Sequence, residues 1–141
     1  MTKKHKKRFS RHVIALILMI SFVTGIAYFF SIQTSERDVK LKDDPNFPRY
    51  VYNSNKSLLA YRIAITIPAI LKKVPCTCGC SIIGHTSNAD CFLNHDGYNM
   101  HGSNCDLCDN IAADTFKLYK QGYTISRIQA IIRKKYKTGN Q

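Results

Sequence analysis

The sequence lacks the features that mark several common classes of protein. It has only nine acidic residues against twenty-one lysines and arginines, and no cysteine before Cys76. Without a cysteine close behind the N-terminal apolar run, a bacterial lipoprotein cleavage site is excluded. No carboxylate pair, nucleophile–base pair or phosphate-binding loop stands out, which argues against a hydrolase or a transferase. No internal repeat is visible. The informative features are therefore the apolar run and the cysteines that begin at residue 76.

The apolar run covers residues 13 to 32, VIALILMISFVTGIAYFFSI, and carries no charge. A helix of that length, at about 1.5 Å rise per residue, spans the ~30 Å hydrocarbon core of a bilayer. Secretory apolar regions are shorter, about 7–15 residues, and Tyr28, Phe29 and Phe30 stand where a cleavage site needs small residues. The run is therefore predicted to be an uncleaved transmembrane signal anchor, with a buried helix of a soluble protein as the alternative.

The positive charge is concentrated before this run. Half of the formal net charge of +12 falls in residues 1 to 12, which hold no acid. Lysine and arginine beside a span resist translocation, which predicts a single-pass protein of the cell membrane with a cytoplasmic N-terminus and the remainder outside. A short basic run can also bind phosphates, but its position favours topology, so no nucleic-acid partner is predicted. The expected partners are the membrane and another membrane or exported metalloprotein.

The remaining chain is predicted to form a linker and one small domain. Residues 33 to 56 are rich in charged residues and contain two prolines, which is typical of a linker. Residues 57 to 137 form the predicted domain, which is rich in cysteine and histidine. A domain of this size buries a low fraction of its surface and often needs disulfides or a metal for stability.

Within that domain, the spacing of apolar residues predicts three helical regions. One begins at Ser57 and is bent or ended by Pro68, the next covers residues 105 to 121, and the last is capped by Thr124. Residues 76 to 103 show little periodicity and are predicted to be irregular. The predicted fold class is mainly α, with one N-terminal transmembrane helix and a small helical domain that holds an irregular Cys/His-rich segment.

All six cysteines lie between residues 76 and 108. The first three have the spacing Cys76-Thr77-Cys78-Gly79-Cys80. Bridging two cysteines that are two apart closes a strained ring, whereas an extended backbone turns alternate side chains to the same face. Gly79 allows the backbone to curl around an ion. This spacing therefore predicts a chelating edge of three thiolates.

The other candidate ligands follow later in the chain. Cys105 and Cys108 stand at a predicted helix start, where the partial positive charge favours thiolates. Two histidines can each add an imidazole nitrogen, whereas His95 lies in a context typical of an exposed turn. The predicted metal ligands are Cys76, Cys78, Cys80, His85, Cys91, His101, Cys105 and Cys108. Eight donors suffice for two four-coordinate ions, and a shared thiolate-bridged cluster would use the same ligands differently.

The metal is predicted to be copper or zinc, because thiolate-rich sites select soft ions. Zinc would be structural, copper would imply metal handling, and an iron–sulfur cluster is a weaker alternative. Two other functions stay open. Cys105 and Cys108 could form the redox pair of a thiol–disulfide oxidoreductase, and three disulfides in one of fifteen pairings could staple an interaction module.

The cysteine pattern resembles that of a family of bacterial and archaeal exported proteins named for the motif Pro-Cys-Tyr-Cys-Gly-Cys. The similarity covers roughly residues 57 to 137 and includes Pro75-Cys76-Thr77-Cys78-Gly79-Cys80, Gly84-His85, Cys91-Phe92, His101, Cys105-x-x-Cys108 and Gly122. Thr77 stands at the position of the tyrosine in the motif, so the difference removes none of the possible metal ligands. The resemblance implies the domain boundaries and membrane attachment, although here the predicted anchor is a helix rather than an acylated cysteine. It implies no activity.

Overall fold

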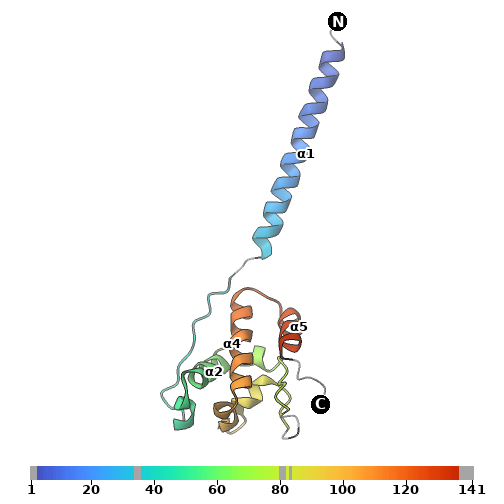
Figure 1. The fold of residues 1–141 in the computed structure, drawn as a ribbon. Helices are drawn as coiled ribbons and strands as arrows, with labels where there is room; N and C mark the ends of the chain where they lie inside the picture. The colour runs from blue at the N-terminus through green and yellow to red at the C-terminus, as the bar shows by residue number, and fades with distance from the viewer. Residues whose placement is uncertain (1–2, 34–35, 80–81, 83, 137–141) are drawn as a thin grey trace. The chain divides into compact units, whose positions relative to one another are not determined.

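The computed structural model describes the backbone of residues 3–33, 36–79, 82 and 84–136. Clustering of contacts divides the chain into two compact units, Met1–Ser35 and Glu36–Gln141. The first unit contains the helix α1, Lys3–Gln33, and the second contains the other described helices and all the described cysteines (Figure 1).

Helix α1 is exposed along its described side chains, which are those of residues 12 to 28. Two hydroxyls in the middle of the run donate back to the helix. The Ser21 Oγ donates to the Leu18 carbonyl at 2.9 Å, and the Thr24 Oγ1 donates to the Ile20 carbonyl at 2.9 Å. Such bonds satisfy the hydroxyls locally without a partner from another element.

No helix in the described part of the chain is both long enough and apolar enough to cross a bilayer. The predicted transmembrane helix at residues 13 to 32 is therefore wrong, and the fold class is corrected to a mainly helical one without that span. The predicted single-pass placement in the cell membrane is wrong for the same reason. The prediction treated every uncharged residue as apolar, although Ser21, Thr24 and Gly25 interrupt the run.

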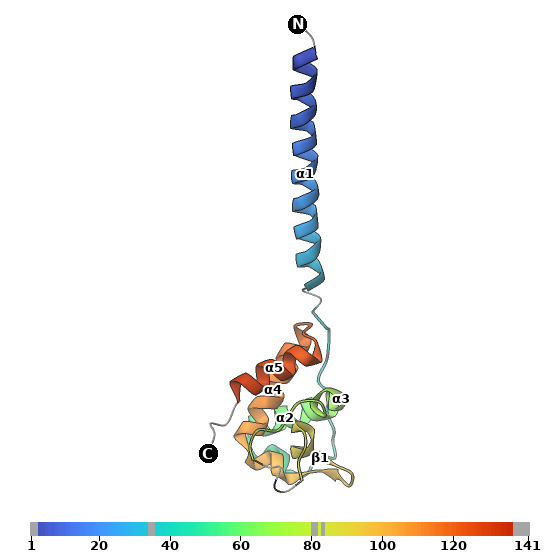
Figure 2. The ribbon, with the colours of Figure 1, turned by 90° about the vertical axis from the view of Figure 1, so that its right-hand side faces the viewer.

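The second unit is built around two helices that pack against each other (Figures 1 and 2). These are α2, Asn55–Thr66, and α4, Asp106–Lys120. Ala60, Tyr61 and Ala64 of α2 share one core cluster with residues of α4. The last helix, α5, Ile125–Lys135, packs on α4 through a smaller cluster that contains Ile111, Ile128 and Ile132. Helix α4 therefore lies between the other two and carries residues of both clusters.

The helix ends follow the expected capping chemistry, with one shift. Ser54 caps α2 by accepting the Ser57 N–H at 2.9 Å, so the helix begins before the predicted start. Pro68 begins the short helix α3, Pro68–Leu71, as its first residue. Thr124 caps α5, as predicted. Gly122 has a φ of +85°, the left-handed conformation that commonly ends a helix.

Short elements make up the segment between α3 and α4, in agreement with its predicted irregularity. An antiparallel hairpin pairs Leu93 with Tyr98 and Asn94 with Gly97. The strands of this hairpin are β1, Leu93–Asn94, and β2, Gly97–Tyr98. The 3-10 turns η3, Asn88–Cys91, and η4, Met100–Asn104, lie on either side of it. This segment lies against α2 and α4 and carries part of the cysteine cluster.

An aromatic core fixes this segment to α2. Tyr61 is completely buried, and its ring meets the Phe92 ring edge-on at 5.2 Å between centroids. The Tyr61 hydroxyl donates to the Asn99 carbonyl. The Phe47 ring packs against the same tyrosine, with 6.4 Å between the ring centroids. Val51 is also buried and belongs to the 3-10 turn η1, Arg49–Asn53. Part of the segment interpreted as a linker therefore contributes side chains to the core.

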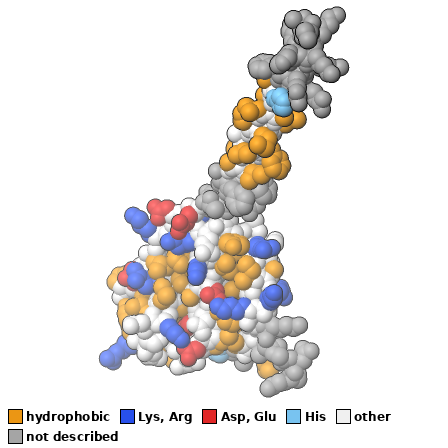
Figure 3. All heavy atoms as spheres, turned by 45° about the horizontal axis from the view of Figure 1, so that its top comes forward, with side chains coloured by type: hydrophobic (Ala, Val, Ile, Leu, Met, Phe, Trp, Pro, Cys, Tyr) orange, Lys and Arg blue, Asp and Glu red, His pale blue; other side chains and the backbone are white. Residues whose placement is uncertain are grey.

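The surface of the second unit mixes basic and hydrophobic side chains. On the face in Figure 3, lysines and arginines are scattered among hydrophobic side chains, with acidic ones between them. Positive charge does not gather into one patch on that face. The distribution of charge on that face therefore indicates no single binding surface. The candidate site is the cysteine cluster.

Candidate metal centre

Four cysteine sulfurs from three separate segments meet beside the first turn of α4. The Cys76 Sγ lies 2.9 Å from the Cys78 Sγ, 3.4 Å from the Cys91 Sγ and 3.9 Å from the Cys108 Sγ. The Cys108 Sγ lies 3.0 Å from the Cys91 Sγ and 3.6 Å from the Cys78 Sγ. Sulfurs around a tetrahedral zinc at about 2.3 Å are about 3.8 Å apart. Small outward shifts of the side chains would therefore admit an ion.

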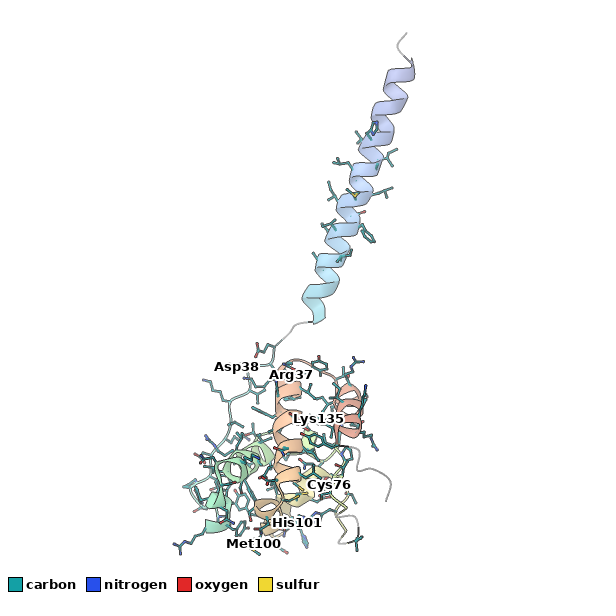
Figure 4. All side chains as sticks on the ribbon, viewed as in Figure 1. Arg37, Asp38, Cys76, Met100, His101 and Lys135 are labelled. Carbon is teal, nitrogen blue, oxygen red and sulfur yellow. The ribbon has the colours of Figure 1, made fainter. Side chains whose placement is uncertain are left out.

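These sulfurs lie in the interior of the unit. Cys91 and Cys108 are fully buried in the main core cluster, and Cys76 and Cys78 pack against it half-buried. Figure 4 shows Cys76 and His101 toward the end of the second unit that lies away from Arg37. The Arg37 guanidinium donates to the Tyr119 carbonyl, near the C-terminal end of α4, so the cluster belongs to the N-terminal end of that helix.

A second set of four donors overlaps the first. Cys78, His101, Cys105 and Cys108 offer ligand atoms that all lie within 4.8 Å of one another. The sulfurs of the first set also lie within 4.8 Å of one another; these are the sulfurs of Cys76, Cys78, Cys91 and Cys108. Cys78 and Cys108 belong to both sets. The six residues therefore form one continuous arrangement of donors.

Of the two other predicted ligands, one lies beside these sets and the other is not among the described residues. The His85 Nδ1 lies 3.8 Å from the Cys91 Sγ, and its ring packs at right angles to the His101 ring at 4.9 Å between centroids. His85 is thus next to the cluster but in neither four-donor set. Cys80 lies outside the described residues. That the collected side chains bind a metal remains a prediction.

Local structure explains how the sulfurs are presented. Gly79 has a φ of +82°, a left-handed conformation that favours glycine and turns the chain directly after Cys78. At the start of α4, the Cys105 Sγ accepts the Cys108 N–H at 3.4 Å. Cys105 therefore takes the N-cap position that a serine or asparagine side chain often fills, and both sulfurs lie at the helix start.

Two asparagines hold the site together, and neither was predicted from the sequence. The Asn99 Nδ2 donates to the Asp90 carbonyl at 2.7 Å and its Oδ1 accepts the His101 N–H at 3.0 Å. Asn88 is fully buried and donates from Nδ2 to the Cys108 carbonyl at 3.1 Å. Asparagine before a short helix is a known capping signal, which could have revealed Asn99. Nothing local marks Asn88, because its partner lies twenty residues away.

A family model for a protein of unknown function with PCYCGC motif matches residues 32–141. The chain belongs to the PCYCGC family. The match begins well before residue 57, so the matched region includes the segment that contributes Phe47 and Val51 to the core. The family description says nothing of export or of membrane attachment, which the resemblance had implied. No curated protein and no solved structure matches the chain.

The PCYCGC motif of this chain, residues 75 to 80, carries the most acidic thiol of the cluster. Hydrogen bonds from the thiols of Cys108 and Cys91 lower the pKa of Cys76 to about 3. The same contacts with Cys76 and Cys91, together with burial, raise the pKa of Cys108 above its ordinary value. Without a metal, the cluster therefore concentrates negative charge on Cys76. A bound cation would favour the thiolate form of every sulfur, so binding would release protons.

The redox state of the cluster is mixed. Cys76, Cys91, Cys105 and Cys108 carry free thiols. Cys78 is disulfide-bonded in the structure, so its sulfur becomes a metal donor only after reduction. The PCYCGC motif thus has a sulfur whose role depends on the redox conditions.

Next to Cys108, Asp109 is a buried carboxyl group with only 5% of its surface exposed. Its Oδ1 has no hydrogen-bond partner among the described residues. Burial, with a smaller contribution from Asp106, raises the pKa of Asp109 from 3.8 to about 6. The charged form is therefore less stable in the folded chain than in the unfolded one.

We predict that Asp109→Asn stabilises the reduced, metal-free chain at pH 8 and has little effect at pH 4. Because the folded-state pKa of Asp109 is raised, the wild-type chain loses stability as the pH rises from about 4 to 6. At 1.36 kcal/mol per pKa unit, the loss is about 3 kcal/mol above pH 6, and asparagine avoids it. Urea unfolding at the two pH values measures the difference. An equal effect at both would contradict the prediction.

Proposed function

We propose that this chain is a metal-binding protein whose first four-donor set, Cys76, Cys78, Cys91 and Cys108, holds a zinc ion in a closed structural site. The observation that carries this proposal is the meeting of these four sulfurs, from three segments, within 4.8 Å of one another. The ion would tie the loop after α3 and the turn η3 to the start of α4. It would thereby stabilise a segment that has little regular structure of its own.

Core packing alone gives no reason for this arrangement. Buried cysteines often serve as small hydrophobic side chains, and such residues gain stability from contact with larger apolar groups. Here the sulfurs of Cys76, Cys91 and Cys108 approach one another at 3.0 to 3.9 Å. Mutual contact among thiols of separate segments is the geometry that a shared ion requires.

The donor set favours zinc over the other soft metals. Four protein ligands at roughly tetrahedral spacing, two of them fully buried, match a structural zinc site with no open position. Thiolates also bind Cu⁺ strongly, so copper handling is the competing outcome of the experiment. In an iron–sulfur cluster the cysteines are shared among two or more irons with inorganic sulfides between them, so they cannot all lie within 4 Å of one another as the sulfurs of Cys76, Cys91 and Cys108 do.

Metal analysis of the full chain tests this proposal. The chain is reduced and supplied without oxygen either with Zn²⁺ alone or with Cu⁺ alone, then desalted and analysed by elemental mass spectrometry. We expect at least one retained zinc per chain, one fewer in Cys91→Ser, and no loss in the control His95→Ala, whose side chain is 90% exposed. A chain that retains copper when supplied with Cu⁺ but retains no zinc when supplied with Zn²⁺ would support metal handling instead. A folded, reduced chain that retains no metal would overturn the proposal, whatever the variants show.

Thiol–disulfide exchange is a second candidate function, and the contact between Cys76 and Cys78 supports it at a different pair from the predicted one. The redox pair predicted from sequence was Cys105 and Cys108, which are both free thiols. The Cys76 Sγ instead lies 2.9 Å from the Sγ of the disulfide-bonded Cys78. Attack by the Cys76 thiolate would form a Cys76–Cys78 bond, break the existing bond of Cys78 and release its former partner as a thiolate.

Exchange with glutathione separates the two functions. A redox protein would equilibrate with oxidised and reduced glutathione and carry no metal as isolated. Cys76→Ser would then slow the exchange strongly, whereas Cys105→Ser would not. If the exchange rate of the metal-free chain is unchanged by Cys76→Ser, the redox function is rejected.

A further inference from the structure

We infer that the reduced chain holds two metal ions rather than one, in a centre where the sulfurs of Cys78 and Cys108 each bridge both ions. This inference rests on the proposed function, because the first ion is the one proposed above. The second ion would take the remaining ligands from His101 and Cys105. Its donors lie within 4.8 Å of one another, as the donors of the first ion do.

Sharing follows from the number of donors. Two four-coordinate ions need eight ligand positions, and among the described residues the two sets together contain six residues, because Cys78 and Cys108 occur in both. A thiolate sulfur can bind two ions at once, whereas His101 offers one ligand nitrogen to a single ion. The two residues common to both sets are cysteines, which is the chemistry that bridging requires. The terminal ligands are then Cys76 and Cys91 on one ion, and His101 and Cys105 on the other.

Charge also favours the second ion. One divalent ion with four thiolates has a formal charge of about −2, in a setting where Cys91 and Cys108 are fully buried. A second divalent ion with the Cys105 thiolate and neutral His101 brings the charge of the centre to about −1. The centre with two ions is therefore less costly to bury. Two monovalent copper ions would leave about −3, so divalent ions are expected.

The start of α4 prepares two of the sulfurs for this role. Cys105 is the N-cap of this helix and Cys108 lies in its first turn. The partial positive charge at a helix start favours the thiolate form. The Cys105 Sγ already accepts a backbone N–H, at 3.4 Å, which shows that an electron pair of this sulfur points toward the helix start.

His101 is the histidine that the fold places in the second set. Its backbone N–H is held by the Asn99 Oδ1 at 3.0 Å. The next residue, Gly102, approaches Phe92 so closely that a Cβ would lie 2.4 Å from a ring carbon, which fixes the turn η4 against the core. His85 lies beside Cys91 instead and packs its ring against that of His101, so it supports the site from outside.

The experiment uses the reduced full chain, with Zn²⁺ and Co²⁺ as probes. Native mass spectrometry should find two zinc ions per chain. On titration with Co²⁺, the electron paramagnetic resonance signal should grow to one equivalent and then fall toward two, because bridging sulfurs couple the two spins antiferromagnetically. This second measurement needs no mutation, so it stays informative if a variant fails to fold.

Variants assign the second ion. Cys105→Ser and His101→Ala should each lower the zinc content from two to one, while the control His95→Ala keeps two. If the wild-type chain and Cys105→Ser each bind one zinc ion per chain, the inference is overturned and the proposed function is retained. Two cobalt ions without spin coupling overturn bridging. A reduced chain that binds no metal overturns both the inference and the proposed function.

Discussion

Zinc should raise the free energy of unfolding of the reduced chain by about 4 kcal/mol when free zinc is a thousand times the dissociation constant. The reason is that only the folded chain brings Cys76, Cys78, Cys91 and Cys108 together from three segments. Unfolding separates the donors and loses most of the binding energy. Urea unfolding with zinc or with a chelator, followed by circular dichroism of the helices, measures this change.

Two controls make the zinc result specific. Mg²⁺ should not stabilise the chain, because it prefers oxygen ligands to thiolates. Without a reductant the zinc effect should shrink, because the disulfide at Cys78 removes a sulfur from the set. Equal stabilisation by the two metals, or no dependence on reduction, would speak against a thiolate site built around Cys78.

Tyr61→Ala should cost about 3–5 kcal/mol of folding free energy, the range for removing a large buried aromatic side chain. Tyr61 is completely buried, meets the Phe92 ring at 5.2 Å and donates its hydroxyl to the Asn99 carbonyl. Its loss would leave a cavity between α2 and the segment that carries Cys91. Urea unfolding of the reduced, metal-free variant measures the cost.

Two further tyrosine variants separate packing from other effects. Tyr61→Phe keeps the ring and should cost only about 1 kcal/mol, the contribution of a typical hydrogen bond. Tyr52→Ala is the matched truncation at a side chain that is 55% exposed, and it should cost much less than Tyr61→Ala. Similar costs at the two positions would mean that the aromatic core does not hold α2 against the hairpin segment.

Local sequence signals predicted the helices of the second unit well. Pro68 at the first position of α3, Thr124 as the cap of α5 and Gly122 after α4 act through contacts within a few residues. Such signals are visible in the sequence because their partners are close along the chain. The same kind of inference failed for residues 13 to 32, where absence of charge was taken as sufficient apolar character.

The candidate site was only partly predictable. The spacing of Cys76 and Cys78, and of Cys105 and Cys108, identified sulfurs that could act together because each pair lies on one local face. Which pairs combine was not visible, since Cys76 and Cys108 are separated by 32 residues and meet only through the fold. The buried Asn88, which links the loop at Val74 to the Cys108 carbonyl, depends on contacts of the same long range.

The sequence by itself therefore determined the types of donor, their local spacing and the helices around them, because these depend on residues a few positions apart. Only the tertiary structure decided that, among the described residues, Cys78 and Cys108 belong to both donor sets and His101 belongs to one of them. Those choices depend on how α4, η3 and the loop after α3 pack around Tyr61 and Phe92. Contacts between distant segments are set by the shape of the whole core, which no local pattern records.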